Sequence, residues 1–109
     1  TGGISGDEVS ELRGLRVSEK LTCAFTYILG SIRGADRRTY VGWCIDLDQR
    51  LDAHNAGRGA RSTRGRFWVL LYAERHATRN EAMSREVSLK RDRKFRSGLA
   101  ALLDANAFK

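Results

Sequence analysis

The sequence contains no apolar run that approaches the roughly 20 residues needed to cross a bilayer. Its longest apolar stretch, Phe67–Ala73, has the length of a single β-strand. The opening residues, Thr1–Gly6, offer neither a basic leader nor an apolar segment, so we expect no signal peptide. These absences predict a cytoplasmic protein without a membrane partner.

Cysteine is also scarce, and Cys23 and Cys44 are the only two in the chain. Neither has Cys or His neighbours at metal-binding spacing, and the pair does not form a Cys-X-X-Cys motif. We therefore expect two reduced, partly buried thiols, with a disulfide between them as the less favoured alternative.

Acidic residues are outnumbered, since 13 Asp and Glu stand against 20 Lys and Arg and give a formal net charge of +7. Of the basic residues, 16 are arginine and only 4 are lysine. The planar guanidinium presents a fork of donors that matches phosphate oxygens. The imbalance favours binding to nucleic acid, although a basic excess also occurs in proteins that bind none.

With 109 residues, the chain is long enough for one hydrophobic core and too short for two. Residues 1–20 begin with glycines, carry a net charge of −1 and contain a short helical pattern over Asp7–Leu15. We expect an N-terminal tail or extension over residues 1–20 and a single domain over residues 21–109.

Apolar and polar residues alternate over residues 21–29, as in a strand with one buried face. Turn residues at Arg33–Arg37 lead to a second strand, Thr39–Cys44, which closes a hairpin. The run Phe67–Tyr72 predicts a third strand, apolar enough to be the central one. Helices are predicted between and after these strands. The fold class is therefore α+β, a small three-stranded antiparallel sheet flanked by helices.

Capping residues mark where the helices begin. Asp46 can cap the first helix, and Thr78 opens the second with a glutamate three residues later, as in a capping box. A basic and then apolar stretch, Arg91–Leu103, predicts a third helix.

The second helix carries a carboxylate in an unusual position. Ala82, Met83 and Val87 predict its packed stripe, and Glu86 falls on or beside that stripe. A carboxylate there requires an explanation, because uncompensated burial is costly. Pairing with Lys90, one turn further on, is the ordinary explanation.

Two tyrosines and two basic residues are the other candidate functional side chains. Tyr27 lies on the first strand and Tyr40 on the second, while Arg50 and His54 share one side of the first helix. Taken singly, the tyrosines would be core aromatics, the histidine a cap at the helix end, and Arg50 a partner of Asp46.

Five segments in order form a joint pattern. The pattern consists of Phe25–Tyr27, Tyr40–Gly42, the helix Asp46–Asn55, the loop Ala56–Arg66 and the segment Glu81–Glu86. Together they resemble the GIY-YIG nucleases, in the branch of small stand-alone bacterial members that includes the UvrC N-terminal domain and the Slx-type resolvases. The resemblance covers about residues 24–100. It departs at Phe25 and Thr26, which stand where the family has glycine and isoleucine, and this concerns the fit of the first strand.

The resemblance implies hydrolysis of DNA phosphodiester bonds with one divalent metal ion, Mg²⁺ or Mn²⁺, held by Glu86. Such an ion commonly takes one or two protein carboxylates and keeps several waters. Tyr40 would accept the proton of the attacking water, and Tyr27 would orient the water or Tyr40. Arg50 would stabilise the charge on the scissile phosphate. His54 would donate to a phosphate oxygen or assist the tyrosine.

The loop between the first helix and the third strand combines arginine with glycine and contains no acid. Its arginines are expected to hold the DNA backbone, because such contacts give affinity without sequence specificity. They are Arg58, Arg61, Arg64 and Arg66. A solvated connecting loop is the minority interpretation. Phe67 and Trp68, which follow, could stack on an unpaired base, although Trp68 is better explained as a core residue.

The resemblance thus implies a metal-dependent endonuclease, structure-selective or weakly sequence-specific, acting on flaps, junctions or lesion-bearing duplex as in DNA repair. The alternative is a non-catalytic nucleic-acid-binding module that works through a partner. DNA is the expected substrate, and RNA stays open. A homodimer or a protein partner also stays open, because one small domain cuts both strands only as a dimer or by two separate nicks.

Overall fold

Three strands and three α-helices make up the part of the chain that the computed structural model describes, residues 23–103. The strands are β1 (Ala24–Arg33), β2 (Asp36–Cys44) and β3 (Val69–His76). The helices are α3 (Leu47–Asn55), α4 (Arg79–Arg91) and α5 (Arg93–Ala100), and a 3-10 turn spans Arg61–Thr63. The predicted tail over residues 1–20 lies outside the described residues. The predicted fold class, α+β with a three-stranded antiparallel sheet, is confirmed.

The central strand of the sheet is β1, since the strand order is β2-β1-β3 and both pairings are antiparallel. Because β1 has a strand on each side and helices over both faces, all of Thr26–Ser31 is buried. The prediction that the third strand is central was wrong, because β3 is an edge strand. Half-buried and exposed residues largely alternate along it, and Leu70 is among the exposed ones. The apolar run Phe67–Tyr72 was therefore not sufficient evidence for a strand that is buried on both faces.

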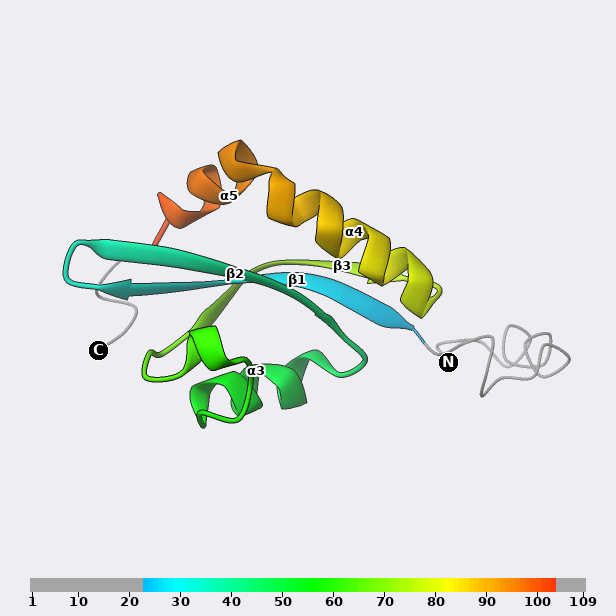
Figure 1. Cartoon of the computed structure of the whole chain (residues 1–109), viewed down its shortest axis with the longest axis horizontal. Coiled ribbons are helices and arrows are strands. Elements are labelled where there is room, and N and C mark those ends of the chain that lie inside the picture. The colour runs from blue at the N-terminus through cyan, green and yellow to red at the C-terminus, as the bar shows by residue number, and fades with distance from the viewer. Residues whose placement is uncertain (1–22, 104–109) are drawn as a thin grey trace, which may run out of the picture.

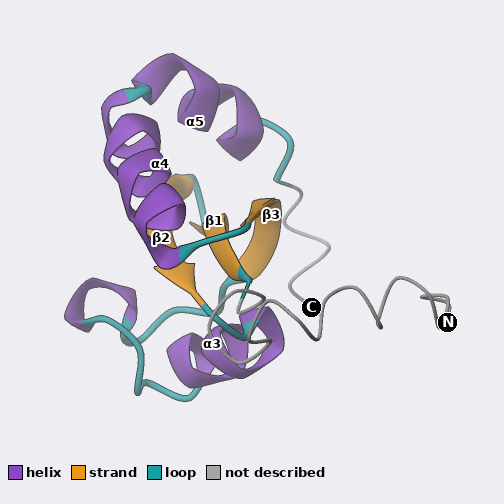
Figure 2. Ribbon diagram, turned by 90° about the vertical axis from the view of Figure 1, so that its right-hand side faces the viewer, coloured by secondary structure: helices purple, strands orange, loops and turns teal. Residues whose placement is uncertain are grey.

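The sheet lies between two helical layers, with α3 on one face and α4 and α5 on the other (Figure 1, Figure 2). Successive side chains of a strand point to opposite faces. Tyr27 therefore joins a core cluster on the α3 side that includes Leu51. Ile28 points the other way and packs with Leu89 of α4 and Phe95 of α5. This alternation along β1 gives the domain two small cores, one on each face of the sheet.

The predicted helix caps are confirmed. At the start of α3, Asp46 Oδ1 accepts a hydrogen bond of 3.1 Å from the backbone N–H of Gln49. At the start of α4, Thr78 Oγ1 accepts from the backbone N–H of Glu81 at 3.1 Å. Glu81 Oε1 in turn accepts from the backbone N–H of Ala77 at 3.1 Å, one residue before the position of the ideal capping box.

Both cysteines are free thiols, as predicted, with Cys44 buried and Cys23 partly buried. Cys44 belongs to the core cluster that contains Tyr27, and burial raises the pKa of its thiol. It is therefore a neutral packing group. Within residues 23–103, no helix is long and apolar enough to span a membrane.

The packed stripe of α4 differs from the prediction. Ala82 and Leu89 are fully buried, whereas Met83 is 39% exposed and Val87 is 48% exposed. Residues 82 and 89 are two helical turns apart, so they define the line along which α4 touches the sheet. Glu86 lies on that same line, four residues after Ala82 and three before Leu89. The apolar side chains at 83 and 87 belong to the neighbouring, outward face.

Exchanging Leu89 for alanine therefore tests where α4 meets the sheet. Leu89→Ala leaves a cavity in the core cluster with Ile28, so we expect a loss of about 2–5 kcal/mol in the free energy of unfolding. Val87→Ala is the matched control on the same helix, and we expect a change within about 0.5 kcal/mol. Urea denaturation followed by circular dichroism measures both. Equal losses for the two variants would contradict this packing line.

Candidate active site

Three of the five predicted catalytic residues form one cluster of rings on the α3 face of the sheet. Tyr27 of β1 and Tyr40 of β2 have ring centroids 6.3 Å apart. The imidazole of His54, on α3, lies 6.0 Å from the Tyr27 ring and 4.9 Å from the Tyr40 ring. The alternation of the two strands and the buried side of α3 thus bring together side chains that are distant in sequence.

Gly42 makes room for this cluster. It pairs with Tyr27 across the two strands. A Cβ atom at residue 42 would lie 2.6 Å from the Tyr27 hydroxyl oxygen, closer than atoms can pack, and 3.0 Å from Cε2 of Tyr40, which is a tight contact. The glycine of the Tyr40-Val41-Gly42 segment is therefore required by the tyrosine opposite it.

A chain of hydrogen bonds fixes the proton positions around His54. Tyr27 Oη lies 3.0 Å from His54 Nε2, and Thr63 Oγ1 lies 2.7 Å from His54 Nδ1. The Thr63 hydroxyl donates its single proton to the carbonyl oxygen of Ala60 at 2.9 Å. Thr63 must therefore accept from His54, so His54 carries its proton on Nδ1. Nε2 is then the acceptor, and the Tyr27 hydroxyl donates to it.

The two hydrogen bonds of His54 change the role predicted for it. The side chain is only 1% exposed, and burial, followed by the charge of Arg50, lowers its pKa. The ring is thus neutral, and its one N–H is bound to Thr63. The prediction that His54 donates to a phosphate oxygen is wrong, because no donor is left for a substrate. Its geometry agrees with the other predicted role, assistance to a tyrosine.

The loop after α3 closes over His54 at a glycine. A Cβ atom at Gly59 would overlap His54 Nδ1, so no larger residue fits at this position without a shift. Thr63, fully buried in the 3-10 turn, reaches the same nitrogen from the other end of the loop. Gly59 and Thr63 were both missed in the sequence, since nothing in an arginine-glycine loop distinguishes a residue that touches a buried histidine.

Tyr27 is held as a neutral phenol. Burial is the main factor that raises its pKa, with a further contribution from Tyr40. Since its proton points to His54, the lone pairs of its oxygen are free to accept a hydrogen bond. Tyr40, in contrast, is half-buried, and its hydroxyl makes no hydrogen bond to another residue within 23–103. The two tyrosines therefore differ in what they can do, although they stand side by side.

Arg50 has an unusual environment for a cation. Its Nε atom is buried and has no hydrogen-bond partner among the described residues. The predicted ion pair with Asp46 does not form, because that carboxylate accepts from the backbone of Gln49. The charge of Arg50 nevertheless acts on the ring cluster, where it lowers the pKa of His54. A buried N–H without a partner is costly, so this position is suited to an acceptor supplied from outside the chain.

Glu86 approaches the cluster from α4. Its side chain is 19% exposed. Its Oε2 lies 3.5 Å from Nζ of Lys90, so the ion pair predicted between these two residues is present. It accepts no hydrogen bond within residues 23–103, and its negative charge contributes to the raised pKa of Tyr27. The carboxylate is therefore within electrostatic reach of the rings and has free lone pairs.

A divalent cation fits Glu86 only with waters as its other ligands. Among the described residues, no group of three or more His, Cys, Asp or Glu side chains is arranged to hold a metal. One largely buried carboxylate that accepts no hydrogen bond is nonetheless a sufficient anchor for Mg²⁺, which keeps several waters. The donor set is thus compatible with the predicted single metal.

The four loop arginines are not equivalent. Arg58, Arg61 and Arg64 are exposed, but the Arg66 side chain is only 5% exposed. Arg66 Nε donates to Ser31 Oγ at 3.1 Å, and its NH1 donates to Asp36 Oδ2 at 3.0 Å. These bonds tie Arg66 to the β1–β2 hairpin. The prediction that it holds the DNA backbone therefore fails, because its donors are already engaged.

The two aromatic residues after the loop differ in their exposure to solvent. Trp68 is buried, and its indole N–H donates to the Thr63 carbonyl oxygen at 2.8 Å. It is a core residue, as favoured from the sequence, and is not available to stack on a base. Phe67, which precedes β3, is exposed.

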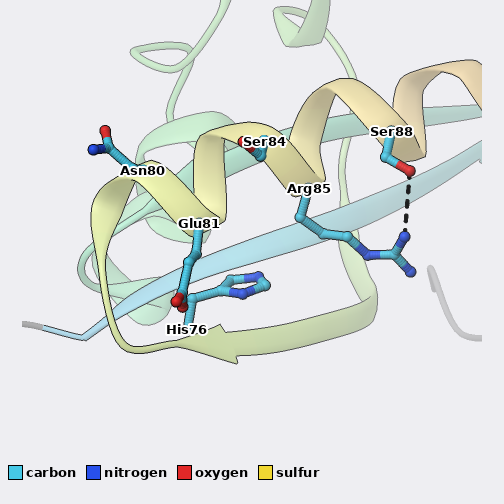
Figure 3. Close-up of a pocket in the computed structure, with 6 residues that line it drawn as sticks. All are labelled: His76, Asn80, Glu81, Ser84, Arg85 and Ser88. Carbon is cyan, nitrogen blue, oxygen red and sulfur yellow. Dashed lines mark hydrogen bonds between the residues drawn. The ribbon is translucent and has the colours of Figure 1, made fainter.

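A depression between α4 and β3 contains none of the predicted site residues (Figure 3). It is lined by His76, Asn80, Glu81, Ser84, Arg85 and Ser88. Its charged groups already have partners: Arg85 Nε donates to Glu74 Oε1 at 2.9 Å, and Glu81 caps the start of α4. His76 ends β3, and its Nε2 lies 3.0 Å from Oγ1 of the buried Thr26. These contacts hold α4 on the sheet and offer no free reactive group.

Comparison with known proteins identifies this combination of fold and site. Residues 23–99 match the family model described as the GIY-YIG catalytic domain. The match covers most of the chain, so the chain belongs to the GIY-YIG family, a family of nucleases.

Small bacterial proteins of this family are its relatives. This chain is 42% identical to a UPF0213 protein of Streptococcus pneumoniae over 72 residues, which are 65% of this chain and 70% of the relative. It is 45% identical to a UPF0213 protein of Streptococcus pyogenes over 75 residues, which are 68% of this chain and 77% of the relative. No solved structure matches the chain.

Replacement of Thr63 tests the hydrogen-bond chain around His54. Thr63→Val keeps the size of the side chain but leaves the buried Nδ1–H without an acceptor, so the free energy of unfolding should fall by about 1–3 kcal/mol. Thr63→Ser keeps the hydroxyl and should lose about 1 kcal/mol or less, for one methyl group. Urea denaturation at neutral pH measures both. A serine variant as unstable as the valine variant would refute the proton assignment.

Proposed function

We propose that this chain is a divalent-metal-dependent endonuclease that hydrolyses DNA phosphodiester bonds, with structure-selective or weakly sequence-specific cleavage. The observation that carries this proposal is the buried, unpartnered Nε of Arg50. It stands in electrostatic contact with a cluster of two tyrosines and a histidine, in a chain that matches the catalytic domain of a nuclease family. Phosphate oxygens, like carboxylate oxygens, form strong charge-assisted hydrogen bonds with a guanidinium.

In the proposed reaction, Arg50 binds the scissile phosphate and stabilises the negative charge that develops on its oxygens. A donor already in position and partly shielded from water stabilises such charge without reorganisation. Since no carboxylate of the described residues neutralises Arg50, its full charge is available to the substrate.

To act as the base, Tyr40 would first release its phenolic proton to solvent, and its phenolate oxygen would then take the proton from the attacking water. As the new P–O bond forms, the bond to the leaving oxygen breaks and that oxygen takes a proton from solvent. The Tyr40 hydroxyl makes no hydrogen bond to another residue within 23–103, whereas the Tyr27 hydroxyl is committed to His54. Tyr27 acts by accepting a hydrogen bond from the water or from Tyr40, which sets the direction of attack. His54 and Thr63 are positioning residues, because they fix which way the Tyr27 proton points.

Glu86 would hold the metal. When bound, a divalent cation supplies Lewis-acid stabilisation of the charge on the scissile phosphate. The interaction of Glu86 with Lys90 is long, at 3.5 Å, and the Lys90 side chain is 56% exposed, so a cation would displace it at small cost.

The exposed arginines of the loop would hold the flanking DNA backbone. Arg58, Arg61 and Arg64 have no partner to give up within residues 23–103. Phosphate contacts fix the position of the duplex and do not distinguish sequences, which agrees with cleavage directed by the shape of the DNA.

Substitutions at the site test the reaction. Glu86→Gln, Arg50→Ala and Tyr40→Phe should each lower the rate of cleavage about 100-fold or more, since each removes a metal ligand, a phosphate contact or a base. Asp52→Asn, which removes an exposed carboxylate of α3, is the control and should cleave like the wild type. Cleavage is measured on duplex, flap, junction and single-stranded substrates with Mg²⁺, with Mn²⁺ and with chelator. DNA binding without cleavage under all these conditions would favour the non-catalytic module instead.

Arginine substitutions in the loop separate binding from stability. Changing Arg58, Arg61 and Arg64 together to glutamine should reduce the slope of log Kd against log salt by about 0.9 for each phosphate that the variant no longer neutralises. Arg66→Gln should leave the slope unchanged and lower the free energy of unfolding, because it breaks the bonds to Ser31 and Asp36. Fluorescence anisotropy with labelled duplex measures the slope. A salt slope that falls only in the Arg66 variant would reverse this assignment.

A further inference from the structure

A second cluster of cations lies away from the ring cluster, in a cleft between β2 and α5. The cleft has a volume of about 280 Å³. It is lined by Arg37, Thr39, Arg93, Arg96, Ser97 and Ala100. Three guanidinium groups and two hydroxyl groups thus surround it, and no carboxylate of the described residues lines it.

The cleft opens on the face of the sheet opposite to α3. Thr39 and Tyr40 are consecutive residues of β2, so their side chains point to opposite faces. Tyr40 joins the rings on the α3 side, and Thr39 lines the cleft on the side that α5 covers (Figure 2). The cleft is therefore distinct from the arginine loop that follows α3.

Arg96 is held rigidly at the back of the cleft. Its Nε donates to the carbonyl oxygen of Leu89 at 3.1 Å and its NH2 to that of Lys90 at 2.7 Å, at the C-terminal end of α4. Its NH1 lies 3.4 Å from Thr39 Oγ1. These bonds use three of the five N–H donors of a guanidinium and leave two. They also leave its positive charge without a counter-ion among the described residues.

The other two arginines are also without anionic partners in the described part of the chain. Arg37 donates one bond, of 3.4 Å, to the carbonyl oxygen of Leu103, and Arg93 is exposed. Neither they nor Arg96 pairs with a carboxylate of residues 23–103. Asp92, the acid next to Arg93, accepts instead from the backbone N–H of Phe95 at 3.1 Å. Three cations around one cleft repel one another, and an anion between them removes that repulsion.

We propose that this cleft binds a phosphate of the nucleic-acid backbone, as a second DNA contact on the opposite side of β2 from the arginine loop. The inference rests on the proposed function. Because β2 is an edge strand, a DNA strand can pass along it from one face to the other. Lys90, whose carbonyl anchors Arg96, lies one turn of α4 beyond Glu86. The cleft is therefore anchored to the same helix that carries Glu86.

Arg93 and its neighbour Lys94 supply a matched pair for the test. Both are exposed residues of α5, but only Arg93 lines the cleft, so Arg93→Gln and Lys94→Gln remove the same charge from adjacent positions. Arg93→Lys keeps the charge. Arg96 is unsuitable because it also caps α4. DNA binding is measured by fluorescence anisotropy with labelled duplex in chelator, between about 50 and 200 mM salt, so that cleavage does not interfere.

We expect Arg93→Gln to weaken binding at low salt and to reduce the slope of log Kd against log salt by about 0.9, the value for one phosphate contact. Lys94→Gln should retain the wild-type slope, and Arg93→Lys should restore most of the affinity. Equal behaviour of the two glutamine variants would overturn the proposal. A titration with inorganic phosphate at constant ionic strength distinguishes a free-anion site. Phosphate binding that depends on Arg93, with an unchanged DNA slope, would likewise overturn the DNA contact.

The experiments distinguish a wrong assignment of the phosphate site from a wrong assignment of the nuclease activity. A wild type that does not cleave with Mg²⁺ or Mn²⁺, but whose DNA slope depends on Arg93, would refute the nuclease and support the cleft. A wild type that cleaves, with equal slopes for Arg93→Gln and Lys94→Gln, would refute only the cleft.

Discussion

The bonds on the two sides of His54 join the three parts of the chain that build the candidate site. One nitrogen of the ring receives the proton of Tyr27 on the central strand, and the other donates to Thr63 in the loop. The histidine itself belongs to α3. A strand, a helix and a loop thus meet at one buried, neutral ring. The Thr63 hydroxyl donates to the Ala60 carbonyl oxygen, and this sets the direction of both hydrogen bonds of the ring. A different proton position on the imidazole would leave at least one of these groups unsatisfied.

The candidate site residues come from both faces of the sheet. The α3 face carries the two tyrosine rings and His54, and α4, on the other face, carries Glu86. The line of α4 that touches the sheet runs through Ala82 and Leu89, and Glu86 lies between them. The apolar packing of α4 against the sheet therefore sets the position of Glu86, although Glu86 itself is charged.

The sequence predicted the parts of the structure that depend on local rules. The strands and the helix caps follow from periods and from turn and capping residues, which are properties of neighbouring positions. The central strand was predicted wrongly because apolar content does not say how many neighbours a strand has. The role of Arg66 was predicted wrongly, and Thr63 and the cleft of Arg93 were missed, for a similar reason. Their partners lie on other elements, and only the tertiary structure brings them within hydrogen-bonding or electrostatic distance.

The unpartnered Nε of Arg50 also has a consequence for the folded state itself. Folding buries this donor and leaves it without the hydrogen bond that water gave it in the unfolded chain, so the free protein carries a local penalty. A ligand that supplies the missing acceptor binds only the folded form and raises its stability through mass action. Binding of a phosphate by Arg50, as proposed above, would therefore also stabilise the folded protein against unfolding.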